Sequence, residues 1–203
     1  MDAVKFAAFW DLFRRRAGDL ALAASADDPV YDALLAQLQQ VHPGLLLEFS
    51  AEGDGGELIV TADGDPSLFS LARAIVAAAS PVPKWSIRAL KPQLGFPRTT
   101  RWNDCVIRID EIVFDPLDLA GTSDLGIRVF VPGITASDVD AARAAVIRAL
   151  HHGLGEQRYA ESIAFLEVRP TSECDHVADL IPLVQLDSFI KWRATRHGPR
   201  DAG

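Results

Sequence analysis

The chain opens with apolar side chains that recur at the spacing of an α-helix. The first stripe consists of Phe6, Phe9, Trp10 and Phe13. Asp28 followed by Pro29 indicates a second helix, because an acidic N-cap and a proline in the first turn both favour a helix start. Apolar residues at helical spacing follow, and His42-Pro43-Gly44 ends the pattern. The pattern predicts a pair of helices within residues 3–43.

The period then changes from helical to alternating. Two short apolar runs, 45–49 and 58–61, flank the glycine-rich segment 52–56, which is typical of a β-hairpin. A helical stripe follows, and an alternating run comes after it. The stripe contains Leu68, Leu71, Ile75 and Val76, and the run contains Trp85, Ile87 and Ala89. Residues 44–91 are therefore predicted to form strand, strand, helix and strand.

The second half of the chain repeats this order of patterns. Its apolar runs are 106–109, 112–114, 125–131 and 163–168, with a helical stripe from Ser137 before the last run. Residues 106–168 are predicted to form a second strand-strand-helix-strand half-repeat. The two predicted helices share the phrase Ala-Arg-Ala at 72–74 and 142–144. An ancient duplication and chance similarity between alanine-rich helices explain this equally well.

Together these patterns predict an α+β fold. The N-terminal helical pair precedes two strand-strand-helix-strand units that form antiparallel or mixed sheet with helices packed on one face. We expect one globular domain over residues 1–203, with half-repeats at 44–91 and 106–168 and a C-terminal extension over 170–203. Within that extension, 180–184 is expected to lie extended against the core, and the basic end after Lys191 is expected to fray.

The formal net charge of −8 limits the classes of partner. A general nucleic-acid binder needs a basic footprint, so we expect no nucleic-acid partner. An acidic surface engages basic proteins or simply keeps the chain soluble. Because no charge-free apolar run reaches about 18 residues and the N-terminus does not resemble a secretory signal, no membrane association is expected. Cys105 and Cys174 do not make a disulfide framework, and a cytoplasmic location follows as the expectation.

The chain lacks the local motifs of common catalytic and cofactor sites. Gly53-Asp54-Gly55-Gly56 lies between predicted hairpin strands, whereas a phosphate loop joins a strand to a helix. Neither Cys174-Asp175-His176 nor His151-His152 has metal-ligand spacing, and the histidine pair suits a helix end. The sequence has no G-x-S-x-G elbow. We therefore expect no cofactor and no metal, and we favour a non-enzymatic protein while leaving the question of enzyme activity open.

Several short phrases occur in an order that resembles a known group of sequences. They are Phe9-Trp10-Asp11-Leu12-Phe13, Glu57-Leu58-Ile59-Val60-Thr61-Ala62-Asp63-Gly64, Pro83-Lys84-Trp85, Ala89-Leu90-Lys91-Pro92 and Leu180-Ile181-Pro182-Leu183. Over residues 9–190 the chain resembles an uncharacterised bacterial protein family, a domain of unknown function. That family has no established activity, so the resemblance supports the α+β fold and assigns no catalytic residue.

The segment 92–104 is the strongest candidate for a binding surface. It is longer than most connections and has no strand or helix pattern, and long ordered loops are often functional. It contains Arg98, Arg101 and Trp102, which are residue types that dominate binding hot spots. We predict that these three residues bind a partner together with Trp85. The alternative is that Trp102 packs in the core and the arginines pair with the acidic surface.

A cluster of carboxylates follows this segment. It comprises Asp110, Glu111, Asp115 and Asp118. If the carboxylates converged, Asp115 and Asp118 would form an acidic site able to hold a cation or to act as acid and base. The alternative, which we favour, is a solvated turn and a strand edge protected by charge.

These observations support three functional hypotheses. The leading one is a non-enzymatic interaction protein, such as an adaptor, an inhibitor or an immunity-like factor, that docks Trp102 into a protein partner while its acidic groups steer association. The alternative is an enzyme or small-molecule binder whose site lies between the two halves and uses Asp115 or Asp118 with Trp85 and Arg101. The third is a structural subunit of a homo-oligomer.

Overall fold

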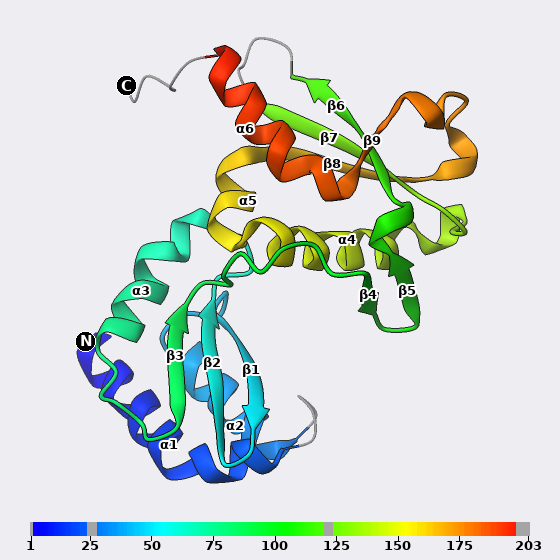
Figure 1. Ribbon diagram of the computed structural model, residues 1–203. Helices are drawn as coiled ribbons and strands as arrows, with labels where there is room; N and C mark the ends of the chain where they lie inside the picture. The colour runs from blue at the N-terminus through cyan, green and yellow to red at the C-terminus, as the bar shows by residue number, and fades with distance from the viewer. Residues whose placement is uncertain (1, 24–27, 120–123, 198–203) are drawn as a thin grey trace. The chain divides into compact units, whose positions relative to one another are not determined.

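The computed structural model describes residues 2–23, 28–119 and 124–197. The chain divides into two compact units, unit 1 (Met1–Lys91) and unit 2 (Pro92–Gly203). Both units combine helices with a small β-sheet, so the predicted α+β class is confirmed (Figure 1). No helix within the described ranges is long and apolar enough to cross a membrane.

Unit 1 begins with the predicted pair of helices. Its helices and strands are α1 (Asp2–Leu22), α2 (Pro29–Gln39), β1 (Leu46–Glu52), β2 (Gly55–Thr61), α3 (Phe69–Ala77) and β3 (Trp85–Ala89). The carboxylate of Asp28 accepts a hydrogen bond from the backbone N–H of Val30 at 2.9 Å, which caps α2. In the sheet, of order β1-β2-β3, β1 and β2 are antiparallel, whereas β2 and β3 are parallel and joined through α3.

One face of the unit 1 sheet packs against helices. The strand register places Leu47, Val60 and Trp85 on the same face, and all three are buried. The ring of Phe13 on α1 meets Trp85 edge-on at 5.3 Å. The indole N–H of Trp10 donates to the carbonyl of Ile75 on α3 at 2.8 Å, which joins α1 to α3. These contacts form the core of unit 1.

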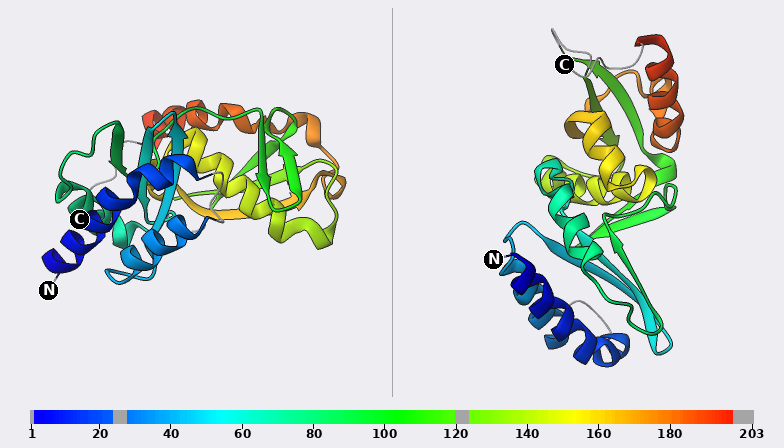
Figure 2. Two further views of the ribbon diagram at one scale, coloured as in Figure 1. Left: turned by 90° about the horizontal axis from the view of Figure 1, so that it is seen from below. Right: turned by 90° about the vertical axis from the view of Figure 1, so that its left-hand side faces the viewer.

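Unit 2 contains a second mixed sheet and a separate hairpin (Figures 1 and 2). Its elements are β4 (Thr99–Trp102), β5 (Cys105–Arg108), β6 (Val113–Asp118), β7 (Leu125–Val131), α4 (Val139–Leu154), α5 (Glu156–Ser162), β8 (Ile163–Pro170), β9 (Ile181–Pro182) and α6 (Leu186–His197). The sheet has the order β8-β7-β6-β9, and β6 runs antiparallel to β7 whereas β7 runs parallel to β8. Both units therefore follow the order strand, antiparallel strand, helical crossover, parallel strand. Duplication and chance similarity stay equal as explanations of this shared order.

Two segments of unit 2 differ from the sequence expectation. The segment 92–104 was expected to be irregular, yet Thr99–Trp102 forms β4 and pairs with β5, so the predicted strand at 106–109 belongs to a hairpin outside the main sheet. Strand periodicity identifies β5 but does not specify its partner, which explains the error. The basic end was expected to fray after Lys191, but α6 continues to His197. Beyond Lys191, Arg193 pairs with Asp118 at 3.1 Å and the guanidinium of Arg196 lies 4.7 Å from the centre of the Trp192 ring. Residues 198–203 lie outside the described part.

Helix α4 packs against both the sheet and the hairpin of unit 2. Its buried residues include Ala142, Ala145, Val146, Ala149 and Leu150. They share one core with Ile107 of β5, Ile127 of β7 and Leu166 of β8. The small alanine side chains permit close approach on both sides of the helix. As a result, the hairpin rests on a rigid support.

The connection between β3 and β4 is fixed to the end of α4. The backbone N–H of Leu94 donates to the carbonyl of His152 at 2.9 Å, and the amide of Gln93 donates to the carbonyl of Gly153 at 3.0 Å. The ring of Phe96 fills the space beside Gly153, where an added Cβ would lie 2.5 Å from the ring. Residues 93–96 are therefore held against the end of α4.

Replacing Gly153 by alanine should destabilise the protein by about 1–2 kcal/mol. Overpacking against Phe96 costs about 1–3 kcal/mol, which exceeds the gain of up to about 1 kcal/mol in helix propensity. Gly18→Ala in α1 is the matched control, because an added Cβ there meets nothing within 4 Å, and it should stabilise slightly. Urea denaturation measures both changes, and equal stabilisation by the two substitutions would contradict the packing of Phe96 on α4.

Candidate functional site

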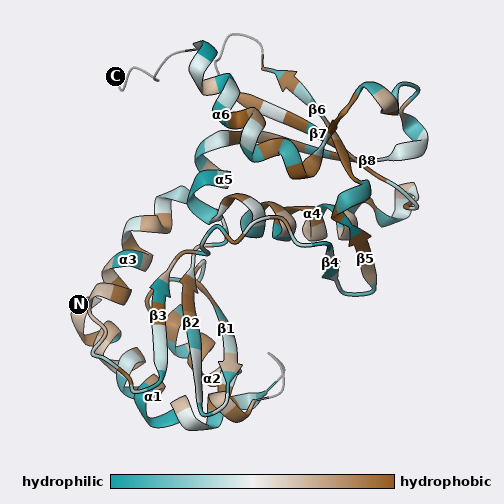
Figure 3. Cartoon of the chain, in the orientation of Figure 1, coloured by the Kyte–Doolittle hydropathy of each residue, from teal (hydrophilic) through white to brown (hydrophobic). Residues whose placement is uncertain are grey.

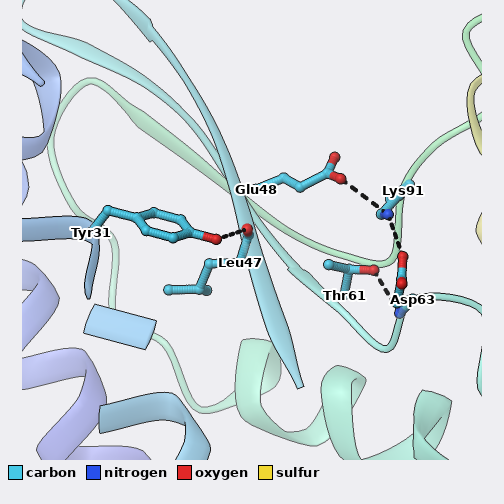
Figure 4. A network of polar contacts seen from close by, with 6 residues as sticks. All are labelled: Tyr31, Leu47, Glu48, Thr61, Asp63 and Lys91. Carbon is cyan, nitrogen blue, oxygen red and sulfur yellow. Dashed lines mark hydrogen bonds and ion pairs between the residues drawn. The ribbon is translucent and has the colours of Figure 1, made fainter. Parts of the chain in front are cut away.

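A cluster of charged groups lies where β2 and β3 of unit 1 end. The ammonium of Lys91 lies 3.0 Å from a carboxylate oxygen of Glu48 and 2.9 Å from one of Asp63 (Figure 4). The side chain of Lys91 is only 13% exposed, whereas those of Glu48 and Asp63 are 41% and 53% exposed. We call these three residues the Lys91 clasp.

The topology of the sheet explains how the clasp forms. Because β2 and β3 are parallel, Asp63, which follows β2, and Lys91, which follows β3, emerge at the same edge. Asp63 adopts a left-handed backbone conformation with φ 51°, and its N–H donates to the hydroxyl of Thr61 at 3.0 Å. Leu90 has φ 64°, and its N–H donates to the carbonyl of Val60 at 2.9 Å. These two turns bring the side chains of Asp63 and Lys91 together at the end of the sheet.

The chemistry of the clasp is that of an ion pair rather than of a reactive amine. Burial acts to lower the pKa of Lys91, but the adjacent Glu48 and Asp63 outweigh it and raise the pKa above its ordinary value. A lysine that acts as a nucleophile or general base needs a lowered pKa. The geometry therefore gives Lys91 a role in fixing the end of unit 1.

The hairpin β4–β5 carries two of the four residues predicted to bind a partner, Arg101 and Trp102, and a third, Arg98, directly precedes it. Its register places Arg101 opposite Val106 and Trp102 opposite Cys105. Thr100 and Ile107 are buried toward α4, and Trp102 lies on that same face at the hairpin tip, where its side chain remains 44% exposed. Arg101 points to the opposite, exposed face. The alternative that Trp102 is enclosed in the core does not hold.

The arginines of the hairpin differ in their partners. Arg108 pairs with Asp110 at 3.0 Å and with Glu111 at 2.9 Å. Arg108, and to a smaller extent Arg98, lowers the pKa of Asp110. Arg101 is exposed and makes no ion pair within the part of the chain that the structure describes. Its charge is therefore available to a partner.

Trp85, the fourth predicted residue, belongs to the core of unit 1. Its side chain is 9% exposed and packs against Phe13. The structure thus places Arg101 and Trp102 on opposite faces of β4, Arg98 directly before that strand and Trp85 in unit 1. The alternating apolar run that contains Trp85 was the signal in the sequence that this side chain is buried.

The two carboxylates of the predicted acidic site do not converge. Asp115 and Asp118 are three residues apart on β6, so their side chains project from opposite faces of the sheet. Asp115 faces Arg128 across the ladder, whereas Asp118 pairs with Arg193 of α6 at 3.1 Å. No group of three or more histidine, cysteine, aspartate or glutamate side chains in the described ranges is arranged to hold a metal ion.

Comparison with protein-family models and with curated proteins finds no match. The resemblance to an uncharacterised bacterial family therefore stays a prediction. The sequence analysis missed the Lys91 clasp, although Lys91 directly follows a predicted strand. Only the parallel register of β2 and β3 brings it beside Asp63.

Replacing Lys91 by methionine should lower the free energy of unfolding by about 1–3 kcal/mol at pH 7, because Glu48 and Asp63 lose their shared cation. Since the pKa of Lys91 is raised, its contribution is complete at neutral pH and is lost only as the pH rises through the folded-state pKa.

Lys84→Met is the matched control for this substitution. Lys84 pairs with Asp54, but their side chains are 62% and 74% exposed, so this change should leave the denaturation midpoint near that of the wild type. Equal effects of the two substitutions in urea denaturation would show that the clasp does not stabilise unit 1.

Proposed function

We propose that this chain is a non-enzymatic interaction protein that binds a protein partner through its β4–β5 hairpin. The observation that carries the proposal is the exposure of Arg101 and Trp102 on a hairpin that forms a sheet of its own. Tryptophan and arginine are enriched among the residues that dominate binding energies. Arg98, also exposed, directly precedes β4.

The support beneath the hairpin favours tight binding. Thr100 and Ile107 are buried toward α4, and the preceding connection is fixed to the end of that helix. A surface that is already ordered loses little conformational entropy when a partner binds. The hairpin is thus suited to present Trp102 in one orientation.

The charges of the chain act over two distances. The formal net charge of −8 steers a partner that is basic overall, in keeping with electrostatic control of association rates. At contact distance the partner meets Arg101 instead. The proposed partner is therefore a protein that is basic overall but presents an acidic contact surface to Arg101.

An affinity capture experiment from lysate of the native host tests this proposal. The wild-type chain should retain a near-stoichiometric protein that the double variant Arg101→Ala/Trp102→Ala loses, because both exposed contacts are removed. Trp192→Ala is the matched control, since Trp192 is also in unit 2 and is 49% exposed on α6.

Circular dichroism must first show that all three proteins are folded. Retention of the same protein by the hairpin variant, or its loss from the Trp192 control as well, would contradict the proposal. So would the absence of any enriched protein.

A further inference from the structure

The hairpin has two open strand edges. β4 and β5 pair only with each other, and no strand in the described ranges pairs with the outer edge of either. An open edge presents backbone N–H and C=O groups that an extended segment of another protein can use. The side chains along each edge determine which kind of segment it would select.

One hydrogen bond fixes which residues point outward. The N–H of Ile109 donates to the carbonyl of Arg98 at 2.9 Å, so Arg98 belongs to a hydrogen-bonded pair. In an antiparallel ladder such pairs alternate with pairs whose backbone groups face away. The backbone groups of Thr99 and Arg101 therefore point to the outer edge of β4, as those of Val106 and Arg108 point to the outer edge of β5.

The side chains along β4 alternate in kind. Arg101 projects from the exposed face and makes no ion pair within the described part of the chain, whereas Trp102 projects from the other face and is 44% exposed. Along β5, by contrast, Arg108 is already neutralised by Asp110 and Glu111. The two strands also differ in hydropathy, since β4 is mostly hydrophilic and β5 mostly hydrophobic (Figure 3). Of the two hairpin edges, that of β4 is the one next to a cation without an ion pair in the described part of the chain.

We propose that the outer edge of β4 accepts an extended segment of the partner as a third strand, with an acidic residue opposite Arg101 and an apolar residue opposite Trp102. This inference rests on the proposed function and adds the chemistry of the bound segment. Main-chain hydrogen bonds to Thr99 and Arg101 supply affinity, and the alternating side chains supply selectivity. A second copy of this chain fits poorly, because β4 contains no acidic residue to place opposite Arg101.

A blocked peptide that alternates valine and glutamate, acetyl-Gly-Val-Glu-Val-Glu-Val-Gly-amide, probes this edge directly. Titrated into the ¹⁵N-labelled chain, it should shift the amide resonances of Thr99–Trp102 with a dissociation constant on the order of 1 mM. The same peptide with lysine for glutamate should bind at least about five-fold more weakly, because it places like charge opposite Arg101. A salt concentration of about 0.15 M limits long-range repulsion by the acidic chain, since the Debye length is then about 8 Å.

Three variants separate backbone from side-chain recognition. Thr99→Pro removes an outward N–H and should weaken binding of the glutamate peptide at least about five-fold, whereas Val106→Pro at the other edge should not. Arg101→Gln keeps the backbone and should abolish the preference for glutamate over lysine. Each variant must give a folded ¹⁵N spectrum, and Arg101→Gln remains decisive if a proline variant does not fold.

Absence of binding, equal binding of both peptides, or unchanged binding by Thr99→Pro would overturn the inference. The same variants distinguish a failure of this inference from a failure of the proposed function. If the captured protein is lost by Arg101→Ala/Trp102→Ala but retained by folded Thr99→Pro, the hairpin binds through side chains alone and the strand-addition inference fails. If both variants retain that protein, the proposed function itself fails.

Discussion

The packing of α4 against two β-layers is the constraint on which unit 2 depends. Helix α4 shares one core with strands β6, β7 and β8 and with the hairpin β4–β5. Alanines at 142, 145 and 149 allow both layers to approach the helix closely, and Val146 and Leu150 supply apolar area. Without α4 the hairpin would have no buried face, because a two-stranded hairpin is at best marginally stable alone. The surface proposed to bind a partner therefore depends on the helix behind it.

The sequence predicted those parts of the fold that local periodicity encodes. The helical stripe from Phe6 to Phe13 and the cap at Asp28 identified the first two helices, and the change of period after residue 44 identified the strand-strand-helix-strand order. Local periodicity did not predict which strands pair with each other. β4 has only four residues, three of them polar, and it becomes a strand because β5 and α4 are beside it. The Lys91 clasp was missed because the proximity of Asp63 and Lys91 depends on a parallel register.

Most charges near the candidate surfaces are neutralised locally. Glu48 and Asp63 hold Lys91, Asp110 and Glu111 hold Arg108, and Asp118 pairs with Arg193. Against this background Arg101 differs, since it is exposed on a strand with an open edge and makes no ion pair within the described part of the chain. A free cation at that position adds little to folding, because exposed charges contribute weakly to stability. It has a clear use in recognition, where a directional cation selects an acidic partner residue.

The open edge of β4 carries the proposed recognition, and amide hydrogen exchange of the isolated chain measures that edge. Thr100 and Trp102 occupy hydrogen-bonded positions opposite β5, whereas the amides of Thr99 and Arg101 face outward. We expect slow exchange at Thr100 and Trp102 and exchange at least about ten-fold faster at Thr99 and Arg101. Equal protection of all four amides would show that the edge is already closed, and would contradict the proposal that another protein adds a strand there.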